Sequence, residues 1–111
     1  IKIPFGTDSP VEDFAPMKNL YCAVTGKDFN GNPEGGWHPE KLLSLSEAME
    51  CYTEHSAYAS FEEDKKGVIA LGYFADITVL ETDIFQIKPE AIKDVEVFMT
   101  MMAGKVRYIK K

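Results

Sequence analysis

Gly67–Glu81 reads GVIALGYFADITVLE, and this stretch decides the fold of the carboxy-terminal half of the chain. Its short β-branched runs are bounded by Gly67 and Gly72, a pattern typical of strands separated by turns. A second stretch, Val95–Ile109, reads VEVFMTMMAGKVRYI and contains two alternating runs on either side of Gly104. Glycine can adopt the positive φ that a tight hairpin turn needs. The two stretches together predict a small antiparallel sheet that ends in a hairpin.

The residues before this sheet follow a helical pattern. Apolar residues recur at i, i+3, i+4 and i+7, which is the spacing of one face of a helix from about Pro16 to Thr25. Pro16 suits the first helical position, and Gly26 is a typical residue just past a helix end. The predicted inner face consists of Met17, Leu20, Tyr21 and Val24.

A second helix is predicted over residues 46–62. Ser44, followed three residues later by Glu47, forms a capping-box pattern, which marks the start of a helix. We expect a break near Ser56. We also expect the helix to end before the acidic run 62–64, because carboxylates oppose the dipole at the carboxy end of a helix.

The amino-terminal run Ile1–Phe5 is apolar and predicts a strand, with Pro4 placing it at a sheet edge or near the strand's end. Nothing in the sequence supplies a partner for it, and a lone strand is not stable in water. We therefore expect that this part of the chain has lost its partners. The next stretch, Gly6–Phe14, reads GTDSPVEDF and carries Asp8 straight into a turn.

Composition narrows the classes of partner. Twelve Lys and Arg against 18 Asp and Glu give a net charge of −6, which argues against nucleic acid because phosphate binding needs a basic surface. No apolar run approaches the roughly 18 residues of a membrane span, and no secretory signal is present, so the cytoplasm is the expected compartment. Cys22 and Cys51 form no CxxC pair, which argues against a zinc ribbon. Two free thiols are favoured, with a single disulfide as the alternative.

Three segments resemble the carboxy-terminal part of metal-dependent amidohydrolases, in the branch of imidazolonepropionase-like and N-substituted formamide deformylase-like enzymes. Residues 6–11, GTDSPV, resemble the segment at the end of the family's eighth barrel strand. Residues 52–81, YTEHSAYASFEEDKKGVIALGYFADITVLE, resemble its long carboxy-terminal signature, and residues 97–108 resemble its closing hairpin. The three segments span nearly the whole chain, and the middle one is the most specific.

The resemblance implies a fold class: an α+β fragment with the last strand and helices of a (β/α)8 barrel plus the carboxy-terminal half of a small antiparallel β-sandwich. Residues 1–64 would be the end of the barrel, with a strand, the Asp8 turn and helices. Residues 65–111 would be the carboxy-terminal strands of the composite β-sandwich. A complete barrel needs about 250 residues, more than this chain has. The expected partner is therefore the missing amino-terminal part of the same protein, and the fragment is expected to self-associate.

The same resemblance makes Asp8 the catalytic aspartate and a metal ligand. It would take a proton from a metal-bound water and later give it to the leaving nitrogen. This fits the chemistry, because a divalent metal lowers the pKa of its water towards about 7 and a nearby carboxylate can then carry the proton. Thr7 and Ser9 could hydrogen-bond the carboxylate and fix its orientation. Spacing alone favours a different use of Asp8, as an Asx turn or helix cap, and the resemblance reverses that preference.

Further residues are candidates for the substrate-side rim of the site. Pro10 and Val11 follow Asp8 directly. Trp37 lies in the long loop Lys27–Glu40, KDFNGNPEGGWHPE, whose length is typical of functional or mobile segments. For Trp37, a packed anchor for the loop is the favoured alternative.

Other polar and soft residues are expected to have structural uses. His38 and His55 form no HxH or HxxxH pair, so surface or helix-packing histidines are expected. Asp76 is expected to bond backbone amides at the entry to a strand. A methionine stripe at strand spacing is expected to pack in the core or between domains, and it consists of Met99, Met101 and Met102.

The leading hypothesis is part of a metal-dependent hydrolase that cleaves C–N bonds other than peptide bonds in small amide-type substrates. A divalent metal, with zinc favoured, would belong to the full-length enzyme, and none is expected on this chain alone. The isolated 111-residue chain is therefore predicted to be inactive. The alternative is a non-enzymatic α+β protein-interaction module, which would bind a partner chain through its exposed apolar faces.

Overall fold

A computed structural model describes all residues, Ile1 to Lys111, and the chain folds as two compact units. One unit comprises Ile1–Phe5, Glu50–Thr82 and Glu96–Lys111, and the other comprises Gly6–Met49 and Asp83–Val95. The chain carries three α-helices, two 3₁₀ helices and a sheet of three strands, so the predicted small α+β arrangement is confirmed. None of the helices has the length and apolar character needed to cross a lipid bilayer.

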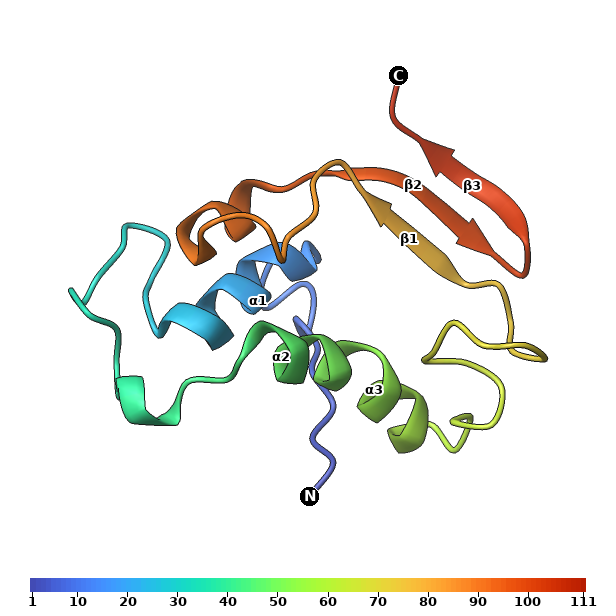
Figure 1. Cartoon of the computed structure of the whole chain (residues 1–111), viewed down its shortest axis with the longest axis horizontal. Coiled ribbons are helices and arrows are strands. Elements are labelled where there is room, and N and C mark those ends of the chain that lie inside the picture. Colours follow the sequence, from blue (N-terminus) through green and yellow to red (C-terminus); the bar gives the residue numbers. More distant parts are fainter. The chain divides into compact units, whose positions relative to one another are not determined.

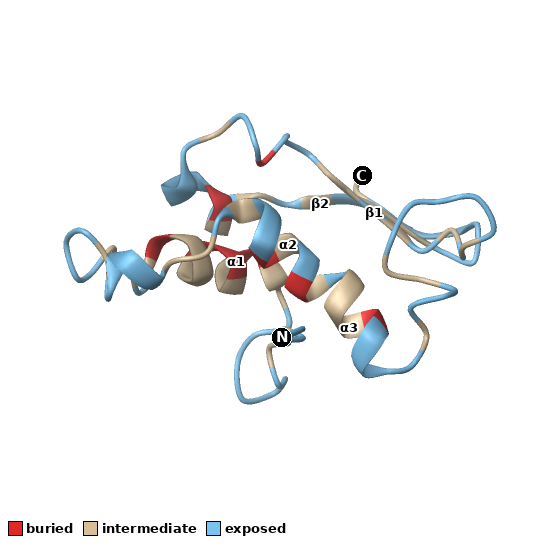
Figure 2. Ribbon diagram, turned by 60° about the horizontal axis from the view of Figure 1, so that its bottom comes forward, coloured by how far each residue is buried: buried red, intermediate tan, exposed pale blue.

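Helix α1, Pro16–Thr25, forms the core of the second unit together with the 3₁₀ helix η2, Pro89–Asp94. Figure 2 shows buried residues along α1. Leu20, Tyr21 and Ile92 are almost completely buried, at 1% exposure each. The predicted bounds of α1 are confirmed. Its last turn ends at Gly26, which has a left-handed φ of 64° and donates its N–H to the Cys22 carbonyl.

Helix α2, Leu45–Tyr52, starts at the predicted capping box. The backbone N–H of Ser44 donates to Glu47 Oε2 at 2.8 Å, and the N–H of Glu47 donates to Ser44 Oγ at 3.3 Å. Helix α3, Glu54–Ala59, follows after a break at Thr53, which has φ −112° and ψ −83°. The predicted break near Ser56 was therefore three residues too late, whereas the helix does end before the acidic run 62–64 as predicted.

The strand predicted for Ile1–Phe5 is wrong for this structure, because no neighbouring strand is present for it to pair with. The segment instead lies against the junction of α2 and α3. Phe5 N–H donates to the Cys51 carbonyl at 3.0 Å, and Ser56 Oγ donates to the same carbonyl at 2.9 Å. The ring of Phe5 also meets Tyr52 edge to face.

The antiparallel sheet has the order β1-β2-β3 and consists of Ile77–Leu80, Val97–Met102 and Lys105–Ile109 (Figure 1). The predicted hairpin is confirmed: Ala103 and Gly104 form its two-residue turn, with φ values of 49° and 74°. The strand runs predicted around Gly67 and Gly72 are wrong for residues 67–76, which form turns and loop, and are right only from Ile77 onward.

Asp76 precedes β1 and accepts a hydrogen bond from the Ala103 N–H at 2.7 Å. Gly104 N–H donates to the Ala75 carbonyl at 3.1 Å. The predicted use of Asp76 is thus confirmed, and its carboxylate ties the entry of β1 to the hairpin turn. Of the methionines predicted to pack, Met99 and Met101 are half-buried, whereas Met102 is exposed.

A lysine links the three strands at the end of the sheet opposite the hairpin turn. Lys110 Nζ lies 2.8 Å from Glu81 Oε1 and 2.7 Å from Glu96 Oε2. Hydrogen bonding to Glu81, and then to Glu96, raises the pKa of Lys110 well above its ordinary value. Because Glu81 follows β1, Glu96 precedes β2 and Lys110 follows β3, this network joins all three strands.

Candidate functional site

Asp8 lies in a turn with a left-handed backbone. Its φ is 51°, and its carbonyl accepts a hydrogen bond from the Val11 N–H at 2.8 Å. Aspartate tolerates this region better than most residues, but the conformation is uncommon outside glycine. The residue is exposed, and the backbone of the turn determines the direction in which its side chain leaves the chain.

The Asp8 carboxylate makes no hydrogen bond or ion pair within the 111 residues. The bonds proposed from Thr7 and Ser9 are therefore absent, and so is the Asx turn that spacing alone favoured. Asp8 does not cap α1 either, because the N-cap is Ala15 and that cap has no side-chain hydrogen bond. A carboxylate held in an uncommon turn, with no structural bond of its own, is available for a ligand or a reacting group.

Asp13, five residues further on, behaves differently. Its Oδ2 accepts from Lys18 Nζ at 2.9 Å, and its Oδ1 accepts from the Ala15 N–H at 3.4 Å. The hydrogen bond from Lys18 holds the pKa of Asp13 below its ordinary value. Asp13 therefore has the structural use that Asp8 lacks, and the two carboxylates form a natural pair for comparison.

Asn19 on α1 connects the helix to Gly6, two residues before the Asp8 turn. Its side-chain Nδ2 donates to the Gly6 carbonyl at 3.2 Å. Sequence reasoning missed this residue. The available signal was an asparagine inside a short helix, where it is a weak helix former and often serves through its side chain.

The predicted rim residues Pro10 and Val11 belong to the same turn as Asp8. Both are exposed, and the Ser9–Pro10 peptide bond is cis. Trp37 lies in a different loop, and no hydrogen bond or ring contact joins it to the Asp8 turn. Trp37 is 70% exposed, and its ring meets the His38 ring edge to face, at 5.0 Å between centroids. The alternative of a packed Trp37 side chain is therefore wrong.

The backbone of the Trp37 loop is nevertheless well anchored. Trp37 N–H donates to the Gly26 carbonyl at 2.7 Å, which brings the two ends of the loop together. Asp28 Oδ1 accepts hydrogen bonds from the backbone N–H groups of Asn30 and Asn32, both at 2.9 Å. These backbone bonds lower the pKa of Asp28, and the bond from Asn32 has the largest effect. Tyr21 Oη donates to the Asp28 carbonyl at 3.0 Å. The loop holds an exposed indole on a fixed backbone.

The residues of this chain do not make a complete metal centre. No group of three or more His, Cys, Asp or Glu side chains lies close enough together to hold an ion. His38 Nδ1 lies 3.0 Å from Glu40 Oε1 at the surface, and His55 Nδ1 lies 3.3 Å from the Ile3 carbonyl. Any metal bound by Asp8 would need ligands from outside these 111 residues.

Cys22 and Cys51 are both free thiols. Cys51 is buried, whereas Cys22 is half-buried. Burial, followed by the charge of Glu12, raises the pKa of the Cys22 thiol, so this cysteine lacks the thiolate character of a nucleophile.

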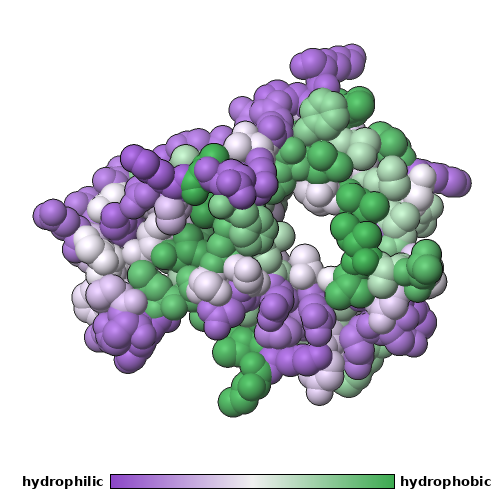
Figure 3. Space-filling model, in the orientation of Figure 1, coloured by the Kyte–Doolittle hydropathy of each residue, from purple (hydrophilic) through white to green (hydrophobic).

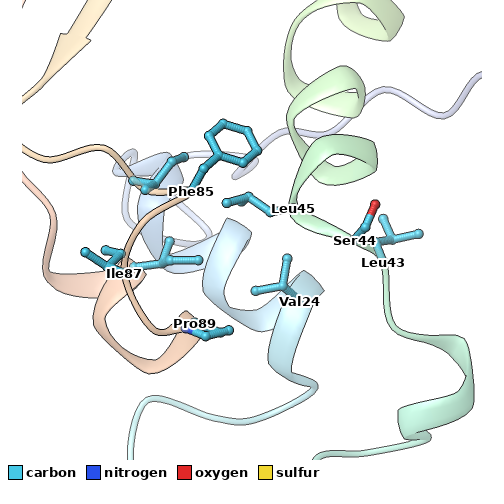
Figure 4. A pocket seen from close by; sticks show the side chains of 9 residues that line it. Val24, Leu43, Ser44, Leu45, Phe85, Ile87 and Pro89 are labelled. Atoms are coloured by element: carbon cyan, nitrogen blue, oxygen red, sulfur yellow. The ribbon is translucent and has the colours of Figure 1, made fainter.

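A cavity of about 310 Å³ lies in the second unit between α1, the start of α2 and the segment before η2. Figure 4 shows Val24, Leu45 and Ile87 around this space. The lining residues are apolar apart from the Ser44 hydroxyl, which already donates to Glu47 Oε2 at 2.7 Å. With no charged group, and with none of the predicted site residues in its wall, the cavity cannot supply acid–base chemistry. Its full lining is Val24, Leu43, Ser44, Leu45, Ile84, Phe85, Ile87, Pro89 and Ile92.

Comparison with known proteins identifies the family. Residues 1–108 match the amidohydrolase family, and the chain belongs to that family. The chain is 34% identical over 105 residues to YtcJ of Bacillus subtilis (strain 168), whose name assigns it provisionally to the amidohydrolases. It is 25% identical over 108 residues to the N-substituted formamide deformylase of Arthrobacter pascens. It is 30% identical over 108 residues to the protein LONG AFTER FAR-RED 3 of Arabidopsis thaliana. No solved structure matches.

The three matches cover 95%, 97% and 96% of this chain but 20%, 19% and 18% of the relatives. The chain thus spans about a fifth of the length of the curated relatives it matches. The family predicted from the three sequence segments is confirmed.

Proposed function

We propose that the complete protein is a hydrolase acting on C–N bonds other than peptide bonds, and that this chain contributes the reactive carboxylate Asp8. The observation that carries the proposal is the unpartnered Asp8 carboxylate, held in a left-handed turn of a chain that belongs to the amidohydrolase family. The name of the Arthrobacter pascens relative makes N-substituted formamides the first substrates to test.

Amide hydrolysis needs a group that can both accept a proton and return it. Hydrolysis of an amide requires a water to lose a proton and the leaving nitrogen to gain one, and a single exposed carboxylate can do both. A divalent metal, with zinc favoured, would supply the activation of that water when bound. Asp8 would hold it together with ligands from the rest of the protein.

The fold proposal follows from the same relationship. We assign the Asp8 turn and the helices to the end of a (β/α)8 barrel, and the three strands to a composite β-sandwich. The division at residues 64 and 65 remains part of this proposal. The partner would be the remaining part of the same polypeptide, and the 111-residue chain alone would be inactive because it holds one of several ligands. The two free thiols favour a cytoplasmic protein.

A pair of substitutions in the complete gene product tests this proposal. Asp8→Asn removes the proton-carrying group without changing the side chain's size, and we expect hydrolysis of an N-alkylformamide to fall by about 100-fold or more. Asp13→Asn changes a carboxylate in the same segment that is already bound to Lys18, and we expect less than about a threefold change. Equal effects of the two substitutions, or full activity of Asp8→Asn, would refute the role of Asp8.

A further inference from the structure

We propose that Asn19 is a positioning residue for the reaction: through its hydrogen bond to the Gly6 carbonyl, it holds the chain two residues before Asp8 and so restrains the turn that carries Asp8. This inference rests on the proposed function of Asp8. It adds to that function a residue on α1 that makes no contact with the Asp8 carboxylate itself.

The Asp8 carboxylate takes its position from the chain that carries it. Since no donor is bonded to it, its position depends on the backbone at residue 8 and on the rotamer that this backbone allows. That backbone is held by the turn bond from Val11 N–H to the Asp8 carbonyl, and Gly6 lies two residues before this turn, which spans residues 8–11. Gly6 has no side chain to fix it, and the space that a Cβ would occupy there is open. Phe5, the residue before Gly6, is bonded to Cys51 and Ser56, and the Asn19 amide extends this restraint to the Gly6 carbonyl, two residues from Asp8.

The helix that carries Asn19 is fixed by the core of its unit. Its next residue, Leu20, is 1% exposed, and so is Tyr21, so the backbone of α1 at this point is packed into the core of its unit. The helix is also closed at its carboxy end by the Gly26 cap. Because the core fixes the helix, a hydrogen bond from this helix restricts the movement of a turn that lies at the surface.

An ion pair holds the other end of the segment 6–13. Lys18, the neighbour of Asn19, pairs with Asp13 at 2.9 Å. Two consecutive residues of α1 thus hold the segment 6–13 at both of its ends, with Asp8 between them. The Lys18–Asp13 pair is exposed and contributes little. The Asn19 bond is exposed too, but it reaches the chain two residues from Asp8, whereas Asp13 lies five residues from it, so we assign the positioning to the Asn19 amide.

The test uses the complete gene product and an N-alkylformamide. Asn19→Asp has the same shape but cannot donate to the Gly6 carbonyl, and it places a negative charge beside that oxygen. We expect kcat to fall about tenfold with KM changed by less than about twofold, because a displaced catalytic group slows the chemical step more than it weakens binding. Asn30→Asp adds the same charge in a loop where only the backbone N–H of residue 30 is bonded, and it should leave both constants unchanged.

A double variant separates positioning from a general loss of stability. In the Asp8→Asn background, the Asn19→Asp substitution should cause no further loss of kcat, because the group it positions is already gone. A further tenfold loss in that background would overturn the proposal. If Asp8→Asn itself leaves activity unchanged, the proposed function fails. If Asp8→Asn abolishes activity and Asn19→Asp does not reduce it, only the positioning proposal fails.

A structural measurement decides the question without an assay. Crystal structures of the complete protein and of its Asn19→Asp variant should show Gly6–Pro10 displaced or with raised B-factors in the variant, and α1 unchanged. An unaltered Asp8 turn in the variant would overturn the proposal.

Discussion

Gly36 occupies a position with no room for a side chain. A Cβ built on it would lie 2.1 Å from the Thr25 carbonyl oxygen, and its φ is 85°. We predict that Gly36→Ala lowers the free energy of unfolding by at least about 2 kcal/mol, because the left-handed backbone cost and the clash add together. Urea unfolding of the chain measures this value.

Gly35→Ala is the matched control for that prediction. Gly35 has a similar φ of 78°, but nothing lies within 4 Å of its added Cβ. The Gly35→Ala substitution should therefore lower the free energy of unfolding only by the cost of the left-handed backbone, about 1 kcal/mol. Equal losses for the two variants would show that the Trp37 loop does not pack against the end of α1 as described.

The hairpin between β2 and β3 contains a residue poorly suited to its backbone. Ala103 has a φ of 49° beside Gly104, and two-residue hairpin turns of this kind favour Asn-Gly. We predict that Ala103→Asn raises the free energy of unfolding by about 0.5 kcal/mol or more. Thermal unfolding followed by circular dichroism measures it. A lower melting temperature of the Ala103→Asn variant would contradict the turn conformation described for residues 103 and 104.

The capping box at the start of α2 makes stability depend on pH. Hydrogen bonds from Ser44, chiefly from its hydroxyl, lower the pKa of Glu47 below its ordinary value. A carboxyl whose pKa is lower in the folded state stabilises the fold above its unfolded pKa, about 4.3 for glutamate. That contribution is lost as the pH falls through the lowered folded value.

The corresponding measurement is a carbon-13 NMR titration of the Glu47 side chain. We expect its midpoint to lie below that of an unstructured glutamate, and the Ser44→Ala variant should return it towards the ordinary value. A midpoint that does not respond to Ser44→Ala would contradict the capping box.

How far sequence alone predicted these elements depends on how local their causes are. Helix α1 was predicted with its correct bounds because its stop signal at Gly26, its first-turn Pro16 and its apolar period all lie within the helix or next to it. The hairpin at Gly104 was likewise determined by adjacent residues. Local patterns of this kind need no knowledge of the rest of the fold.

The errors came from long-range contacts. The break at Thr53 accompanies two bonds to the Cys51 carbonyl, and one of them comes from Phe5, far away in the sequence. Ile1–Phe5 has the composition of a strand, but a strand requires a partner that composition cannot supply. At the candidate site, Asp8 was identified through the family segment. The Asn19 amide was missed because its partner is a backbone carbonyl 13 residues away.

At the scale of the whole molecule, large apolar side chains lie on the surface. Phe61, Ile69 and Leu71 are 88%, 87% and 102% exposed. Figure 3 shows hydrophobic surface over β1 and the segment that leads into it. Exposed groups of this kind are usually covered by another surface. We therefore predict that the 111-residue chain self-associates.

Sedimentation velocity tests this prediction. The chain should sediment faster than a 12.4 kDa monomer, with a coefficient that rises with concentration. Replacing Ile69 and Leu71 by Ser should reduce the association. Monomeric behaviour at all concentrations would contradict the prediction that these exposed apolar residues drive self-association.

The central claim is that this chain works as part of a longer hydrolase, and the size of the native polypeptide tests it most directly. An immunoblot of the native source, with an antibody raised against this chain, should show a band several times larger than 12.4 kDa, in keeping with the fifth of its relatives that the chain spans. A single band near 12.4 kDa would contradict the claim. Asp8 would then have no companion ligands, and the protein-interaction module would become the better account.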